Sequence, residues 1–337
     1  MDLNGKKILI SSCGGLGDLI MFTPALRRLK ELYPSCRLTF MTNAKYREVL
    51  SGIPYIDKVI CIQRGKFLGR YRVLPDFWRQ DMLVFTDWQP QLLLFSWLFR
   101  VPVRTGIPRA GHKLSGCLTK ELQNHVYRYT QYAAQTNAMI FSEALDVNLD
   151  GDMTRLDVSL PQAADVQAID ACLQNIGIVQ NQPYVLLTPF AGLEQRNWPV
   201  TEAARFVRMA EEQLGMPVLV SGPADKREDA ERIGGYNLTG RTTTLQLVEL
   251  VRRAKCLVTP DSGPMHIAGA VDTPVAALFS KDLPSRWAPQ KKCIPITLQT
   301  ECSPCDDDTA RRCTDVKCMR NITAEMVMQA CKKLLNE

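Results

Sequence analysis

Apolar residues follow two patterns along this chain, and the two patterns alternate. Short runs rich in Val, Ile and Leu have the length of buried strands, and longer runs with an apolar residue every three or four positions predict amphipathic helices. Such alternation is typical of a parallel sheet with helices on its faces. We expect strands at residues 7–11, 37–42, 58–62, 82–86 and 103–106, and again at 184–188, 217–220, 256–259 and 275–279.

The helical pattern fills the intervals between these strands and also ends the chain. We expect helices at residues 17–32, 45–51, 89–99, 129–145, 165–176, 201–214, 225–233, 245–254, 264–271 and 323–335. Strands and helices alternate separately in each half, so the sequence predicts an α/β protein with two doubly wound lobes. A ligand of such a sheet binds at the carboxyl ends of its strands.

A polar stretch with strong turn signals separates the two halves. It runs from about residue 148 to 182 and includes Asp150-Gly151-Asp152 and Asn181-Gln182-Pro183. We therefore expect an N-terminal Rossmann-like domain over residues 1–160, a linker region over 161–182, a C-terminal Rossmann-like domain over 183–322 and a C-terminal helix over 323–337.

Composition and charge narrow the class of protein. The 337 residues include 41 Lys and Arg against 35 Asp and Glu, a surplus of +6 that is too small to indicate nucleic acid as a partner. The longest apolar run, residues 92–99, is much shorter than a helix that spans a bilayer, and no export signal precedes the first strand. We expect a cytoplasmic protein.

A glycine-rich loop follows the first strand. It contains Gly14, Gly15 and Gly17, which let backbone N–H groups approach a ligand, and Asp18, which lies where a helix begins. Asp18 suits either interaction with the helix dipole or a functional carboxylate. A dinucleotide fingerprint would need a third small residue where Ile20 stands, so a nicotinamide oxidoreductase is a weaker alternative.

Three further loops of the second half follow predicted strands. Asp261, Ser262 and Gly263 open a helix that carries Met265 and His266, a combination suited to binding a pyrophosphate. Arg196 could clamp phosphate oxygens, although alone it would be an ordinary surface residue. Asp225 could accept ribose hydroxyls or cap the next helix.

These motifs together resemble glycosyltransferase family 9, which contains the ADP-heptose:lipopolysaccharide heptosyltransferases. The resemblance rests on the loop ending in Asp18, on Arg196-Asn197-Trp198-Pro199 and above all on the segment from Asp261 to His266. It implies a GT-B architecture, in which two Rossmann-like domains face each other across a cleft. It further implies that the first domain binds the acceptor, that the second binds the nucleotide-sugar, and that transfer is inverting and independent of metal. Asp18 matches the general base, and residues 261–266 match the donor loop.

The resemblance predicts transfer of a heptose from ADP-L-glycero-β-D-manno-heptose to a lipopolysaccharide inner-core acceptor. A protein hydroxyl as acceptor is an alternative within the family, and a metal-binding scaffold without activity is another reading. The acceptor would be an anionic glycolipid, with peripheral contact to the inner face of the inner membrane. Basic residues interleaved with aromatic ones form either a solvated loop or the surface for that acceptor: Arg64, Lys66, Arg70 and Arg72.

Four of the 12 cysteines lie close together near the end of the chain, in a loop over residues 302–318. They are Cys302, Cys305, Cys313 and Cys318, and their spacing is compatible with a tetrahedral zinc or iron site of structural role. Free thiols, or disulfides formed on purification, are the alternative. No cofactor is expected to take part in catalysis.

Overall fold

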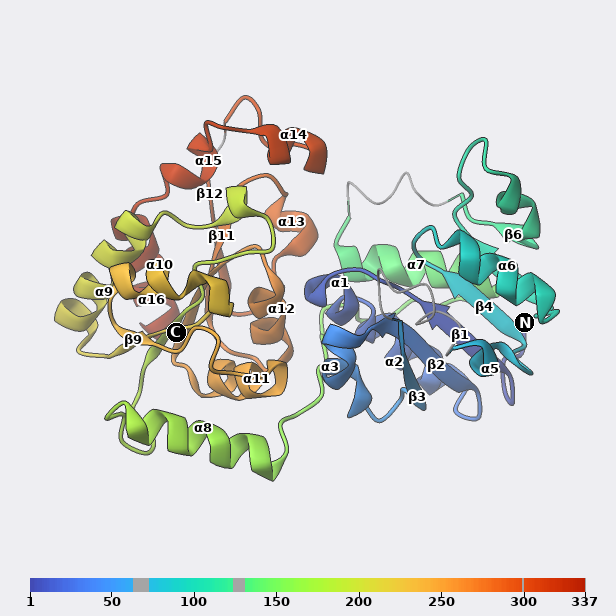
Figure 1. Ribbon diagram of the computed structural model, residues 1–337, viewed down its shortest axis with the longest axis horizontal. Coiled ribbons are helices and arrows are strands. Elements are labelled where there is room, and N and C mark those ends of the chain that lie inside the picture. The colour runs from blue at the N-terminus through green and yellow to red at the C-terminus, as the bar shows by residue number, and fades with distance from the viewer. Residues whose placement is uncertain (63–72, 124–130, 299, 337) are drawn as a thin grey trace. The chain divides into compact units, whose positions relative to one another are not determined.

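The chain folds into two compact units, Met1–Ser159 and Leu160–Glu337. The structure is a computed structural model that describes residues 1–62, 73–123, 131–298 and 300–336. Each unit contains one sheet of six parallel strands. Helices surround each sheet, as the ribbon shows (Figure 1). The expected α/β class and the two doubly wound sheets are confirmed.

The sheet of the first unit has the strand order β3-β2-β1-β4-β5-β6. Its order reverses between β1 and β4, and loops that follow these two strands meet at the carboxyl edge. The strands are β1 Lys7–Ser11, β2 Arg37–Asn43, β3 Lys58–Ile62, β4 Met82–Phe85, β5 Val103–Gly106 and β6 Lys120–Glu121. The helices described are α1 Leu16–Ile20, α2 Thr23–Leu32, α3 Arg47–Ser51, α5 Leu74–Phe77, α6 Pro90–Leu98 and α7 Ala133–Leu145.

The sheet of the second unit repeats this topology in the order β12-β11-β10-β7-β8-β9, with its reversal between β10 and β7. Its strands are β7 Val185–Leu187, β8 Val218–Val220, β9 Tyr236–Asn237, β10 Cys256–Pro260, β11 Val275–Phe279 and β12 Cys293–Thr297. The helices are α8 Ala163–Asn175, α9 Val200–Leu214, α10 Arg227–Ile233, α11 Thr244–Arg253, α12 Gly263–Ala270, α13 Pro284–Trp287, α14 Asp307–Arg312, α15 Lys317–Arg320 and α16 Ala324–Asn336.

The helix expected at residues 17–32 is two helices, α1 and α2. Pro24 has no N–H with which to bond the carbonyl of Ile20, and the hydroxyl of Thr23 donates to that carbonyl instead, at 2.6 Å. The short α1 thereby remains a separate turn that carries Asp18.

The structure contains three strands that the sequence pattern does not predict, β6, β9 and β12. β6 and β9 are two residues long, too short for a recognisable run. β12 contains Pro295, and it lies at the edge of its sheet, where a residue without an N–H is tolerated.

Residues 161–182, expected as a linker region, contain α8 and belong to the second unit. This helix packs against α11, and Asp170 accepts a hydrogen bond from Arg253 at 2.6 Å. The division of the chain therefore falls before α8, between Ser159 and Leu160.

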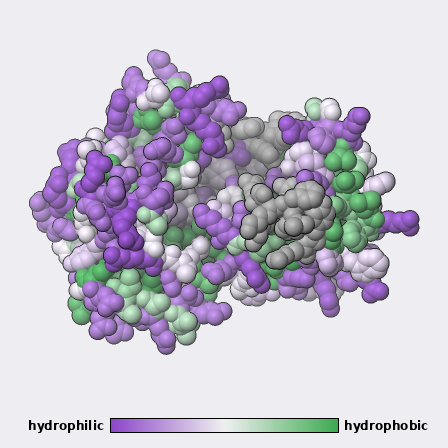
Figure 2. Space-filling model, viewed as in Figure 1, coloured by the Kyte–Doolittle hydropathy of each residue, from purple (hydrophilic) through white to green (hydrophobic). Residues whose placement is uncertain are grey.

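Hydrophilic residues cover most of the face shown in the space-filling view (Figure 2). The first unit nevertheless exposes three large apolar side chains near the ends of α5 and α6: Trp78 at 63%, Trp97 at 51% and Leu98 at 57%. Within the ranges that the structure describes, no helix has both the length and the apolarity that crossing a bilayer requires.

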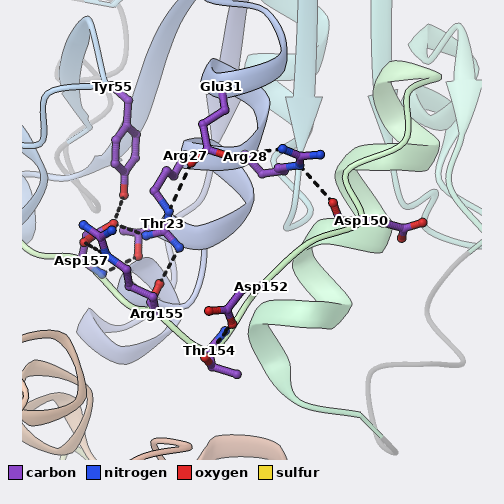
Figure 3. Close-up of polar contacts among 10 residues, drawn as sticks. All are labelled: Thr23, Arg27, Arg28, Glu31, Tyr55, Asp150, Asp152, Thr154, Arg155 and Asp157. Atoms are coloured by element: carbon purple, nitrogen blue, oxygen red, sulfur yellow. Dashed lines mark hydrogen bonds and ion pairs between the residues drawn. The ribbon is translucent and has the colours of Figure 1, made fainter.

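The last segment of the first unit is fastened to α2 by polar contacts, which Figure 3 shows. Asp157 pairs with Arg27, accepts a hydrogen bond from the hydroxyl of Tyr55 at 2.8 Å, and donates its own N–H to the hydroxyl of Thr23 at 2.9 Å. Arg28 donates to the carbonyl of Asp150 at 3.0 Å. These contacts hold residues 150–157 on the helix that follows the Asp18 turn.

Replacing Asp157 by Ala is expected to destabilise the first unit by about 1–3 kcal/mol, because the Arg27 guanidinium and the Tyr55 hydroxyl lose their shared acceptor. Thermal unfolding of the full chain measures the effect. Asp152→Ala is the matched control, since Asp152 is exposed and accepts hydrogen bonds from Thr154, two residues along the chain; a change below about 0.5 kcal/mol is expected there. Equal melting temperatures for the two variants would contradict the fastening role.

Candidate functional site

The reversal point of the first sheet brings the loops after β1 and β4 together. The N–H of Thr86 donates to the carbonyl of Ser11 at 3.1 Å, and the hydroxyl of Ser11 donates to the side chain of Gln89 at 3.0 Å. The N–H of Cys13 donates to the Asp87 carboxylate at 3.3 Å. The glycine loop is therefore held against the start of the β4 loop.

Asp18 is half-buried at the first turn of α1, directly beside this glycine loop. Its Oδ2 accepts the N–H of Gly15 at 2.8 Å, which caps the helix. A Cβ at Gly14 would lie 2.8 Å from both Cβ and Oδ2 of Asp18, so Gly14 has no room for a side chain. Gly17 lies within α1 itself. The structure thus brings Gly14, Gly15, Gly17 and Asp18 together, and Asp18 lies in the first turn of the helix, where interaction with the helix dipole was the alternative to a functional role.

A cavity of about 220 Å³ lies at the same edge of the first sheet. The indole nitrogen of Trp88 is buried there and has no hydrogen-bond partner among the residues that the structure describes. No motif in the sequence marks these residues, since only the position of β4 beside β1 connects them with the glycine loop. The lining residues are Cys13, Ile62, Asp87, Trp88, Gln89, Pro90, Gln91 and Leu92.

The reversal point of the second sheet joins two motifs that lie 65 residues apart, because β7 and β10 are neighbours. Nη1 of Arg196 donates to the Asp261 carbonyl at 3.1 Å and lies 3.5 Å from the Asp261 carboxylate. The Nε of Arg196 is buried and has no hydrogen-bond partner in the described part of the chain.

The loop that carries Arg196 is anchored on both sides. Asn197 accepts the N–H of Ala191 at 2.7 Å, and the buried indole of Trp198 donates to the carbonyl of Ile322 at 2.9 Å. Asn197 and Trp198 therefore fix the backbone of the loop that carries the cationic side chain of Arg196.

Burial controls the protonation of Asp261 and His266. It raises the pKa of Asp261 to about 7, with a further contribution from the negative charge of Asp282 and opposition from Arg196. Burial, helped by the charge of Arg196, lowers the pKa of His266 to about 3. His266 is therefore neutral near pH 7.

The side chains at the start of α12 do not cap it. The hydroxyl of Ser262 donates to the carbonyl of Pro260 at 3.1 Å and also contacts Thr259, so it does not accept an N–H of the helix. Gly263 is the first residue of the helix, and Met265 is fully buried in the core. The amino end of α12 is thus left without a side-chain acceptor.

Asp225 lies exposed in a short 3-10 turn, Ala224–Lys226, after β8. The tight packing here involves its neighbours: a Cβ at Gly222 would lie 2.6 Å from the Phe190 ring, and Gly240, at φ +69°, packs as closely on Ala224. Asp225 stays a candidate for ribose binding on its position alone.

The expected acceptor residues Arg64, Lys66, Arg70 and Arg72 lie outside the described residues. Among the basic residues of the first unit that the structure describes, Arg104 is engaged in the fold, since its guanidinium donates to the carbonyls of Cys117 and Val101. Arg109 and Lys113 are exposed.

The four cysteines of the C-terminal loop are free thiols that line one small cavity of about 60 Å³, together with Arg196 and Lys281. Burial and the neighbouring thiols raise the pKa values of Cys305 and Cys318, although the charge of Lys281 opposes this at Cys305. Among the described residues no three His, Cys, Asp or Glu side chains are close enough to hold a metal ion. The arrangement therefore does not fit the tentative zinc or iron site.

Known proteins resemble this chain over most of its length. The family model described as "Glycosyltransferase family 9 (heptosyltransferase)" matches residues 90–314. A lipooligosaccharide heptosyltransferase 2 from Haemophilus ducreyi is 25% identical over 306 residues, which cover 85% of this chain and 86% of that protein.

Solved structures show the same fold. A family 9 glycosyl transferase from Veillonella parvula superimposes with a TM-score of 0.86 at 20% identity, over 100% of this chain and 99% of that one. ADP-heptose lps heptosyltransferase II from E. coli gives 0.76 at 21% identity, with 98% of each chain covered. The iron-containing glycosyltransferase TibC from E. coli gives 0.61 at 19% identity, over 100% of this chain and 78% of that one. The expected GT-B fold is confirmed. The match to this family rules out the oxidoreductase alternative. The chain belongs to glycosyltransferase family 9, the heptosyltransferase family.

Proposed function

We propose that this glycosyltransferase moves a heptose from ADP-L-glycero-β-D-manno-heptose to an inner-core sugar of lipopolysaccharide, with inversion and without a catalytic metal. The observation that carries the proposal is the contact between Arg196 and Asp261 at the reversal point of the second sheet. A half-buried cation beside an uncapped helix start is suited to a diphosphate. The names of the relatives support the sugar and the acceptor.

The proposed reaction is a direct displacement at the anomeric carbon. An acceptor hydroxyl attacks that carbon while the Asp18 carboxylate takes its proton, and the bond from the carbon to the phosphate oxygen breaks. ADP leaves with the bonding electrons, and the guanidinium of Arg196 stabilises the charge that develops on it. The Gly15 N–H orients the base by holding one oxygen of Asp18.

A panel of nucleoside diphosphates tests the donor, and a turnover assay with ADP-heptose tests the reaction. We expect ADP to raise the melting temperature more than UDP or GDP, and we expect turnover in the presence of a chelator. A heptose-deficient lipopolysaccharide core and a protein hydroxyl are offered in parallel, because a protein acceptor is the remaining alternative. Absence of ADP binding, or transfer to protein alone, would contradict the proposal.

We also propose peripheral contact with the cytoplasmic face of the inner membrane. The exposed Trp78, Trp97 and Leu98 lie near the exposed Arg79 and Arg100, and the ring of Trp78 packs edge-on against Phe99 at 6.5 Å between centroids. Indole rings and cations together suit the surface of an anionic bilayer.

Flotation with vesicles that contain an anionic phospholipid measures this contact. The double variant Trp97→Ser, Leu98→Ser is expected to lose about tenfold in vesicle binding, because about 1–2 kcal/mol of apolar burial disappears. Leu160→Ser, at an equally exposed apolar residue of the second unit, is expected to bind like the unmodified chain. Full retention of binding by the double variant would place the contact elsewhere.

A further inference from the structure

A second cation lies beside Arg196. Lys281 follows β11, the strand next to β10, and its side chain is only 9% exposed. The four-cysteine loop fixes the backbone here: the N–H of Cys305 donates to the carbonyl of Lys281 at 3.0 Å, and the hydroxyl of Ser303 donates to the carbonyl of Ser280. Lys281 is therefore held in place by contacts on its main chain as well as by its burial.

One carboxylate oxygen joins the two cations. Oδ2 of Asp282 lies 3.0 Å from Nζ of Lys281 and 3.7 Å from Nη1 of Arg196. Its Oδ1 accepts a second bond from Lys281 at 3.1 Å. An anionic oxygen placed between an ammonium and a guanidinium makes the contacts that an oxygen of a diphosphate makes in a binding site.

Two cations, Arg196 and Lys281, lie with two carboxyl groups, Asp261 and Asp282. Burial and the charge of Asp282 favour the protonated form of Asp261 by raising its pKa. The carboxylate of Asp282 then faces both cations.

We propose that Lys281 is a second cation for the donor's diphosphate and that Asp282 is an internal counter-ion that competes with this diphosphate for Lys281 and Arg196. The inference rests on the proposed function, since it takes a nucleoside diphosphate as the ligand. Asp282 keeps the two cations close together despite their mutual repulsion, and a diphosphate that binds them must replace its contacts.

The competition has a consequence that distinguishes it from a purely structural role. Removing the charge of Lys281 weakens diphosphate binding, whereas removing the charge of Asp282 strengthens it. If Lys281 and Asp282 only supported the fold, either substitution would weaken diphosphate binding.

Calorimetric titration of the full-length protein with ADP tests the proposal. We expect Lys281→Gln to raise the Kd about tenfold, Lys281→Arg to restore most of the affinity, and Asp282→Asn to lower the Kd about threefold to tenfold. Raising the salt concentration should weaken binding less in Lys281→Gln than in the unmodified chain.

The pair formed by Lys292 and Asp272 provides matched controls, because it lies at the amino ends of the strands of the same sheet. Lys292→Gln and Asp272→Asn are expected to leave the Kd unchanged. If the unmodified chain does not bind ADP, the proposed function fails. If it binds ADP but Lys281→Gln has no effect, or Asp282→Asn binds no tighter, this inference alone is overturned.

Discussion

Asp18→Asn is expected to lower turnover about 10²–10⁴-fold while ADP binding stays within about twofold of the unmodified chain. The asparagine oxygen can still accept the Gly15 N–H, so the helix cap remains. What disappears is the ability to take the proton of the attacking hydroxyl. Asp18→Ala removes both the base and the cap, and comparison of the two variants separates catalysis from stability. Turnover with ADP-heptose and a heptose-deficient core measures the loss.

Asp165→Asn is a close control for this experiment. Asp165 occupies the same position in α8 that Asp18 occupies in α1, since its Oδ2 accepts the N–H of the capping residue Gln162 at 3.0 Å. The two substitutions thus make the same change to a helix start, in different units. We expect normal turnover for Asp165→Asn. Normal turnover for Asp18→Asn would remove Asp18 as the base.

Arg196→Ala is expected to raise the Kd for ADP about 10-fold to 100-fold. A hydrogen-bonded contact between a guanidinium and a phosphate contributes about 1.5–3 kcal/mol, and the guanidinium of Arg196 is half-buried, with its Nε fully buried. Turnover should fall further than binding, because the charge on the leaving ADP is largest in the transition state. Calorimetric titration and initial rates measure the two effects separately.

Two further variants make the Arg196 result interpretable. Arg196→Lys keeps the charge but loses the forked geometry, so an intermediate Kd is expected. Arg232→Ala changes an exposed arginine of the same unit that pairs only locally with Asp229, and it should bind ADP normally. An unchanged Kd in Arg196→Ala would show that the diphosphate binds elsewhere.

The affinity for ADP should also fall as the pH rises from about 6 to about 8. Asp261 has its pKa raised to about 7, so it is mostly neutral at the lower pH and mostly anionic at the higher one. An anionic Asp261 repels the diphosphate and competes for Arg196. The terminal phosphate of ADP gains charge over the same range, which by itself would favour binding to cations. A fall in affinity would therefore come from the ionisation of Asp261 and not from that of ADP.

Most of the fold can be predicted from the sequence because parallel strands, buried on both faces, leave continuous apolar runs. The strands at residues 7–11, 58–62, 103–106 and 275–279 have the bounds that the pattern predicts. Short strands such as β6 and β9 and an edge strand with a proline leave no such run. Helix ends shift where a hydroxyl or a proline changes the hydrogen bonding, as at Thr23.

The candidate site was predictable only in parts. Asp18, Arg196 and Asp261 each follow a predicted strand in a glycine-rich or cationic motif, which made them recognisable. Lys281 and Asp282 lie in no such motif, and their importance depends on β11 lying beside β10. Strand order and the distances between side chains cannot be seen in residue spacing. The spacing of the four cysteines, for the same reason, predicted a metal site that the described arrangement does not form.

The small cavity that the four thiols share with Arg196 and Lys281 offers a practical route to follow ligand exchange. Cys302 is the exposed member among 12 thiols that are otherwise buried or half-buried. A fluorescent dye attached there by maleimide chemistry would lie next to the cationic cluster. Its emission would report nucleotide arrival and departure in real time, in single molecules as well as in bulk solution.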